Sequence, residues 1–178
     1  MKRAITRSVQ ASVNAPAVAS AAAVDYQAKL QIPCAVLGIR TQNNQVVGVD
    51  FLPLREATLN PYDDFTHAVC MQITAYVKDA DFPLDVPIRL SGTPHQRKVW
   101  QALRTISPGT TRTYGDLAQQ LSSSPRAVGG ACGDNPIPLF IPCHRVVAQN
   151  GVGGFMHHAR GDPLAIKAWL LHHEGWRR

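Results

Sequence analysis

The sequence predicts an α+β N-terminal domain, in which an antiparallel sheet packs with a helix, followed by a mostly α-helical C-terminal domain with a helix-turn-helix. Residues 26–52 indicate the sheet, because they hold runs rich in β-branched residues around a turn signal. From residue 91 onward, short helical patterns follow one another with tight connections. Three regions are therefore expected: a flexible N-terminal tail (1–24), a small α/β domain (25–90) and a second domain (91–178).

Three strands and one helix are expected in the first domain. Residues 35–41 and 45–52 flank Asn43-Asn44, which favours a hairpin, and residues 26–32 alternate apolar and polar side chains as a third strand would. A helix is predicted between Pro61 and Lys78, where apolar side chains recur at helical spacing: Phe65, Val69, Ile73 and Tyr76. The following residues 81–90 contain two prolines and predict an extended linker. No group of catalytic side chains is evident in this domain.

The second domain opens with Thr93-Pro94, an N-cap followed by a proline suited to the first helical turn. Its apolar face is expected to comprise Val99, Trp100, Leu103 and Ile106. Residues 114–121 and 125–132 predict two short helices joined by a brief turn, which is typical of a helix-turn-helix. Leu164, Ile166, Trp169, Leu170 and Leu171 predict an amphipathic last helix that begins near Asp162-Pro163 and ends before Gly175.

Gly129 and Gly130 lie in the middle of the third predicted helix, where each costs about 1 kcal/mol in helix propensity. The absent side chains would let another backbone come close. That backbone is either a packed helix of this chain or DNA, and the sequence leaves both open.

The positive charge is unevenly distributed. Residues 1–91 carry 8 Lys/Arg and 8 Asp/Glu, whereas residues 92–178 carry 10 and 4, a net charge of +6. A basic half-molecule indicates a polyanionic partner, most often nucleic acid, although a generally basic surface is the alternative.

The four cysteines have no CxxC spacing, which argues against a disulfide scaffold or a zinc knuckle and favours a reducing, cytoplasmic setting. No metal site and no cofactor are expected. No run of about 18 apolar residues is present, so no membrane-spanning helix is expected. Residues 1–24 superficially resemble a targeting peptide, but polar residues interrupt their apolar stretch, and a flexible tail is the preferred interpretation.

Cys143 is followed directly by His144 and Arg145, and it is preceded by Pro142. Positive or polarising neighbours lower a thiol pKa and favour the nucleophilic thiolate, while Pro142 predicts a rigid, strand-like approach to the cysteine. The alternative is a small buried cysteine beside a solvated Arg145.

Several segments together resemble one family, the O6-alkylguanine-DNA alkyltransferases (methylated-DNA–protein-cysteine methyltransferases). The Ile141-Pro-Cys-His-Arg-Val146 run is highly specific, and the other segments occur in the family's order. They are Gly92–Trp100, Thr113–Ala118, Arg126–Gly130, Asn135-Pro136 and Leu170–Gly175. The resemblance is dense over residues 91–175 and weak over residues 26–90.

The resemblance implies direct repair of duplex DNA. An O6-alkylated guanine is flipped out, and its alkyl (methyl) group moves irreversibly to Cys143, one group per molecule. His144 would accept the thiol proton through a water, and Glu174 would orient His144. Asn135 would brace the cysteine loop, and Tyr114 would serve the guanine N3 and help to rotate the phosphate.

The resemblance also implies a minor-groove contact through the helix-turn-helix. Arg126 would replace the flipped base, and small residues beside it would fit the narrow groove: Ala127, Gly129 and Gly130. The substrate pocket is expected to include Val146, Phe155, Met156, His157 and Pro138. The protein is expected to act as a monomer, with cooperative clustering on DNA and acceptance of O4-alkylthymine left open.

The segment after the cysteine departs from the family pattern. Phe155 keeps the ring of a tyrosine without its hydroxyl, and His157 and His158 stand where glycines are expected. We expect this bulkier segment to narrow the alkyl pocket and to favour methyl over benzyl groups. Three alternatives remain: a non-catalytic relative that binds alkylated DNA, a helix-turn-helix regulator with a sensing cysteine, and a cysteine hydrolase that uses Cys143 and His144.

Overall fold

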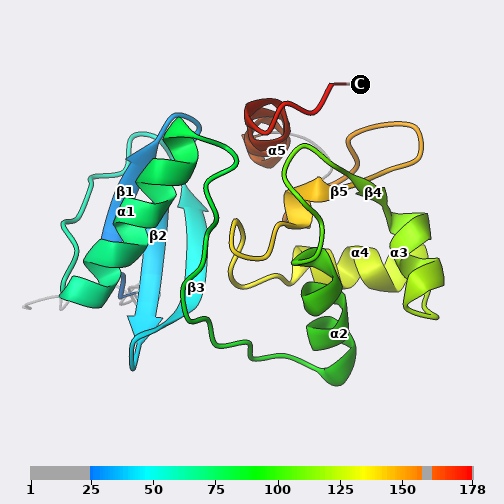
Figure 1. Cartoon of the computed structure of the whole chain (residues 1–178), viewed down its shortest axis with the longest axis horizontal. Coiled ribbons are helices and arrows are strands. Elements are labelled where there is room, and N and C mark those ends of the chain that lie inside the picture. Colours follow the sequence, from blue (N-terminus) through cyan, green and yellow to red (C-terminus); the bar gives the residue numbers. More distant parts are fainter. Residues whose placement is uncertain (1–24, 158–161, 178) are drawn as a thin grey trace, which may run out of the picture.

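The structure is a computed structural model that describes residues 25–157 and 162–177. The expected tail, residues 1–24, and His158 lie outside these ranges. A three-stranded sheet with one long helix occupies one side of the molecule, and the shorter helices occupy the other (Figure 1). No helix in the described residues is long and apolar enough to cross a membrane.

The sheet is antiparallel with the order β1-β2-β3, comprising β1 (Ala28–Ile32), β2 (Ala35–Gln42) and β3 (Gln45–Leu52). The hairpin between β2 and β3 turns at Asn43 and Asn44, whose φ angles of 51° and 53° lie in the left-handed region that asparagine tolerates. Helix α1 (Asp64–Lys78) packs through a buried stripe that includes Val69 and Ile73. The three expected strands, the turn and the helix are therefore confirmed.

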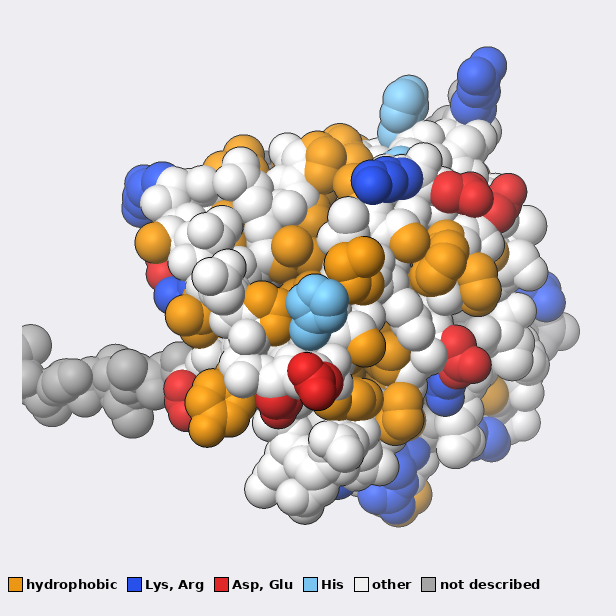
Figure 2. Space-filling model, turned by 60° about the vertical axis from the view of Figure 1, so that its left-hand side comes forward, with side chains coloured by type: hydrophobic (Ala, Val, Ile, Leu, Met, Phe, Trp, Pro, Cys, Tyr) orange, Lys and Arg blue, Asp and Glu red, His pale blue; other side chains and the backbone are white. Residues whose placement is uncertain are grey.

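The chain then crosses to the helical side without regular secondary structure. Along this crossing Ile88 pairs with Val46 of β3, because Val46 donates to the Pro87 carbonyl and accepts from the Arg89 N–H, each at 2.9 Å. The predicted extended linker is thus held against the edge of the sheet. On the face that brings the α1 side forward, apolar side chains lie in separate groups, with charges of both signs scattered among them (Figure 2).

Three short helices follow: α2 (Pro94–Leu103), α3 (Tyr114–Gln120) and α4 (Pro125–Gly133). Each begins at a hydroxyl N-cap, and Thr93 and Thr113 form full capping boxes. The Trp100 indole donates to the Ala131 carbonyl at 2.7 Å and so ties α2 to α4. Ile106, expected on the apolar face of α2, lies beyond the end of that helix but is still buried.

The cysteine segment differs from the expected strand-like approach. Ile141 forms a short bridge with Pro138, but Cys143 begins a 3-10 turn, η1 (Cys143–Arg145). This turn leads into β5 (Val146–Val147), which pairs in parallel with β4 (Arg112–Thr113). The tight turn separates the directions of neighbouring side chains, and this decides what His144 and Arg145 contact.

The last helix, α5 (Asp162–His173), ends before Gly175, whose φ of 77° is a left-handed helix end. The sheet meets the helical side along β3. There the Val49 N–H donates to the Pro136 carbonyl at 2.9 Å, and the Phe51 ring lies 5.9 Å from the Phe155 ring. These contacts hold the cysteine segment between the sheet and the helices.

Candidate active site

Cys143 lies at a cavity of about 320 Å³ and is only 3% exposed. The cavity walls come from α3, α4 and the segment before α5. The lining residues are Tyr114, Pro125, Gly129, Cys132, Gly133, Cys143, Gly154, Phe155, Met156 and His157. Three of the five residues expected in the pocket are therefore in its wall. Pro138 and Val146 are not, because both side chains are packed into the core behind it.

Asn135 joins the end of α4 to the cysteine segment. Its Nδ2 donates to the Ile141 carbonyl at 2.8 Å and to the Cys143 Sγ at 3.1 Å, and its Oδ1 accepts from the Ile137 N–H at 3.1 Å. One side chain thus fixes the loop and points an N–H group at the sulfur. Such a donor stabilises the thiolate more than the thiol.

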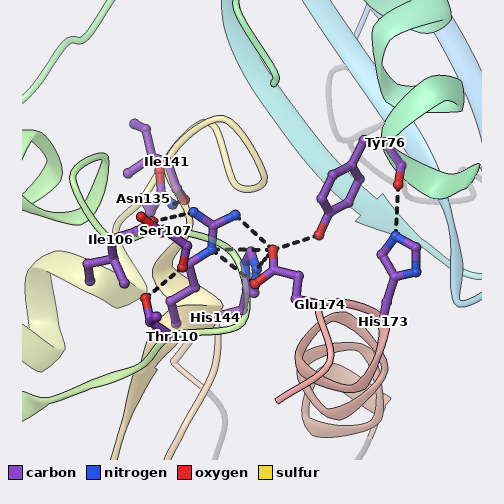
Figure 3. Close-up of polar contacts among 10 residues, drawn as sticks. Tyr76, Ile106, Ser107, Thr110, Asn135, Ile141, His144, His173 and Glu174 are labelled. Carbon is purple, nitrogen blue, oxygen red and sulfur yellow. Dashed lines mark hydrogen bonds and ion pairs between the residues drawn. The ribbon is translucent and has the colours of Figure 1, made fainter. Parts of the chain in front are cut away.

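Glu174 is the centre of a buried polar cluster (Figure 3). Its Oε1 accepts from the His144 Nε2 at 2.9 Å, the Arg145 Nη2 at 2.8 Å and the Tyr76 hydroxyl at 2.8 Å. The Arg145 Nε donates to Oε2 at 3.0 Å, and the Arg145 Nη1 donates to the Ile106 carbonyl. The carboxylate is therefore held from three directions.

The geometry at Glu174 defines the roles of the two His144 nitrogens. Nε2 faces the carboxylate and acts as a donor, so in the neutral ring Nδ1 is the acceptor. Nδ1 is buried, and among the described residues nothing bonds to it. His144 thus carries a free basic nitrogen beside the cysteine and a carboxylate behind it.

The ionisation states differ from the sequence-based expectation that neighbouring charges lower the thiol pKa. Burial raises the pKa of Cys143, and it outweighs the opposing effects of Asn135 and Lys167. Arg145 does not act on the sulfur because Glu174 binds it, and it is buried rather than solvated. Burial also lowers the pKa of His144 despite Glu174. The resting site therefore pairs a neutral thiol with a neutral imidazole.

Glu174 itself stays ionised. Burial alone would raise its pKa, but the hydrogen bonds from His144 and Arg145 lower it to about 2. A buried carboxylate that keeps its charge can stabilise a positive charge appearing on His144.

Lys167 is a site residue that the sequence analysis missed. It is fully buried, and its Nζ donates to the Val146 carbonyl at 2.6 Å and the Gly154 carbonyl at 2.9 Å. Burial lowers the pKa of Lys167 to about 8. Its position was visible in the sequence, since Leu164 and Leu171 lie three residues before it and four after it, on one helical face.

Tyr76 is the second missed residue, and it comes from α1 on the sheet side. Its hydroxyl reaches Glu174, and its carbonyl lies 2.8 Å from the His173 Nε2 (Figure 3). The expectation that the first domain contributes nothing to the site was therefore wrong. The available signal was a tyrosine on a buried helix face, because a buried phenol needs a partner.

Tyr114 lies at the start of α3, where its ring lines the cavity and its hydroxyl donates to the Gly154 carbonyl at 3.1 Å. Burial raises the pKa of its phenol, so the hydroxyl keeps its proton at neutral pH.

The outer face of α4 is open. Arg126 and Ala127 are exposed. A Cβ added at Gly130 would meet nothing within 4 Å, and one at Gly129 would meet only the Tyr114 ring, at 3.9 Å. Packing within the chain therefore does not require these two glycines. The other possibility, that a second molecule approaches this face, is favoured.

No group of three or more His, Cys, Asp or Glu side chains within the described ranges could hold a metal ion.

Comparison with known proteins identifies the family. The model of the 6-O-methylguanine DNA methyltransferase DNA-binding domain matches residues 94–176. The chain is 37% identical over 145 residues to the methylated-DNA–protein-cysteine methyltransferase of Metallosphaera sedula, across 80% of this chain and 88% of that protein. The chain belongs to the methylated-DNA–protein-cysteine methyltransferase family of enzymes. The relative from Shigella flexneri is 47% identical over 93 residues, which span 51% of this chain and 52% of that protein.

Solved structures of the family share the α+β fold. The O6-methylguanine methyltransferase of Mycobacterium tuberculosis superposes with a TM-score of 0.68 at 33% identity, over 82% of this chain and 90% of that chain. A structure of the M. tuberculosis protein in complex with DNA superposes with a TM-score of 0.68 at 32% identity, over 83% of this chain and 91% of that chain.

Proposed function

We propose that this protein repairs DNA by taking the alkyl group, typically methyl, from O6-alkylguanine in duplex DNA onto Cys143, irreversibly and once per molecule. The observation that carries the proposal is the arrangement at the sulfur. Cys143 lies at a cavity, Asn135 donates to it, and the His144–Glu174 pair stands behind it. Family membership supports the same reaction.

The reaction begins with a proton transfer, because the resting thiol is neutral. The thiol proton passes through a water to His144 Nδ1, and Glu174 stabilises the imidazolium that forms. The thiolate then attacks the alkyl carbon. A carbon–sulfur bond forms, the carbon–O6 bond breaks, and its electron pair goes to the purine.

Tyr114 supplies the proton for the departing guanine at N3. Its phenol remains protonated at neutral pH and lines the cavity, so the hydroxyl can turn from Gly154 toward the purine. Main-chain groups of Cys143 and Val146 read the exocyclic amine. The Val146 carbonyl, which already accepts from Lys167, has a second lone pair for this purpose. No cofactor is required, since the acceptor and the base are both side chains.

DNA binds through α3 and α4 as a helix-turn-helix in the minor groove. The exposed Arg126 enters the base stack in place of the flipped guanine. Ala127, Gly129 and Gly130 allow the groove to come close, which agrees with the open space above Gly130. The excess positive charge of residues 92–178 attracts the phosphates.

Residues 25–90 and 91–178 form two domains, and only the second contacts the duplex. The protein acts as a monomer, and its free cysteines suit the reducing cytoplasm.

The test is incubation with a duplex that carries one labelled O6-methylguanine. One equivalent of label on Cys143 is expected, found by mass spectrometry as an added methyl mass on that peptide. Turnover beyond one equivalent would indicate a hydrolase instead. Binding without transfer would indicate a non-catalytic relative or a regulator, and label on Cys132 would move the nucleophile there.

Two variants separate binding from chemistry. Cys143→Ala should still bind the damaged duplex but take no label. Arg126→Ala should keep its reaction with free O6-benzylguanine and lose rate on duplex, because the base must be flipped only in duplex. Equal losses on both substrates would show that Arg126 is structural.

A further inference from the structure

His157 is fastened to the end of α4. Its Nε2 lies 2.8 Å from the Asp134 Oδ1, and the Gln96 Nε2 donates to the other Asp134 oxygen at 2.9 Å. Gln96 is itself fixed in the capping box of α2 through Thr93. One aspartate therefore joins the segment after the cysteine to two helices.

The surface beside Asp134 is shaped to receive the imidazole. A Cβ added at Gly133 would overlap the His157 ring, so the ring occupies the space that the glycine leaves. Histidine and glycine thus fit together as a ring and a seat.

The segment that carries His157 is strained. Met156 and His157 have φ angles of 50° and 61°, in the left-handed region that residues with a Cβ seldom adopt. Such a conformation persists only where surrounding contacts hold it. The bond to Asp134 and the packing on Gly133 are contacts of this kind.

Both partners of the ring-and-seat contact line the cavity that holds Cys143. From this geometry we infer that His157, held by Asp134 against Gly133, is a specificity-determining residue that closes the alkyl pocket to groups larger than methyl. The inference rests on the proposed function and deepens it. A methyl group reacts with the ring seated, whereas a benzyl group requires the ring to leave its seat.

The experiment compares single-turnover rates on duplexes that carry O6-methylguanine or O6-benzylguanine. The benzyl-to-methyl ratio of the wild type should be low, because extra volume in a closed pocket is costly. His157→Gly should raise the ratio about tenfold or more, since it removes the ring and its overlap with a bulky group. Asp134→Asn, which only weakens a largely exposed pair, should raise it between about 1.4-fold and 5-fold.

Gly133→Ala tests the seat from the opposite side. The added methyl expels the ring and should raise the ratio as His157→Gly does. In the double variant the ring is already absent, so the ratio should equal that of His157→Gly alone. His172→Gln, on the exposed end of α5, is the matched control and should leave the ratio unchanged.

The outcomes separate this inference from the proposed function. If the wild type transfers no methyl group, the proposed function is wrong. If it transfers methyl while the ratio is near one, or while His157→Gly and Gly133→Ala leave the ratio unchanged, the size-limiting role of His157 is overturned. Circular dichroism confirms folding, and if His157→Gly fails to fold, Gly133→Ala and Asp134→Asn decide the question.

Discussion

Replacement of Tyr76 by phenylalanine tests the contact between the sheet side and the catalytic carboxylate. The change removes one hydroxyl that donates to Glu174 over 2.8 Å in a fully buried position. A hydrogen bond to a charged group contributes about 1.5–3 kcal/mol. The free energy of unfolding should fall by this amount, and the melting temperature by about 3–12 °C at 2–4 °C per kcal/mol for a chain of this size.

The transfer rate should change much less than the stability. Arg145 still holds the carboxylate through both of its oxygens, so Glu174 keeps its orientation toward His144. A loss of about tenfold or less is expected, equivalent to about 1.4 kcal/mol. Single-turnover methyl transfer and urea unfolding, followed by tryptophan fluorescence, measure the two quantities.

Tyr62→Phe is the matched control, because Tyr62 is 84% exposed. Its unfolding free energy should stay within about 0.5 kcal/mol of the wild type. If Tyr76→Phe were as stable as Tyr62→Phe, the buried hydrogen bond would not contribute in solution. A rate loss of about a thousandfold or more would place Tyr76 in the chemistry itself.

Three further changes have defined outcomes. Glu174→Gln should lower the free energy of unfolding by about 3–5 kcal/mol, because Arg145 keeps a buried charge without a counter-ion, and a loss below about 1 kcal/mol in urea unfolding would contradict this. Asn135→Ala removes a donor that lowers the pKa of Cys143, so the pH midpoint of Cys143 alkylation by iodoacetamide should rise; an unchanged midpoint would refute the role of the amide. The pKa of Lys167, lowered to about 8, lies below its value of about 10.4 in the unfolded chain, so the unfolded chain holds more protons between these values. Unfolding measurements should therefore show wild-type stability rising relative to Lys167→Met across this pH window, by on the order of 3 kcal/mol, and a pH-independent difference would argue against it.

Local signals made much of the fold predictable. The Asn43-Asn44 turn and the Thr93 cap depend on a few neighbouring residues, so the sequence reveals them directly. The contact of Asn135 with Cys143 was also within reach, because the two lie eight residues apart on one loop. The family resemblance supplied the remaining pair, His144 and Glu174.

Long-range packing decided what the sequence did not reveal. Tyr76 and Glu174 are 98 residues apart, and nothing local indicates that a phenol on an apolar helix face will meet a carboxylate. Arg145 follows the catalytic pair in the sequence, yet the tight turn directs it to Glu174 rather than to the sulfur. The predicted activation of Cys143 by neighbouring charge failed for this reason, since burial dominates its ionisation.

The burial of Cys143 has a consequence for a reagent that works only once. In the native protein the sulfur is 3% exposed and holds its proton, whereas in an unfolded chain it would be an ordinary solvent-accessible thiol. Folding therefore acts as a safety catch. Small soluble electrophiles meet a shielded, protonated group, and only a lesion delivered into the cavity meets the thiolate that His144 releases.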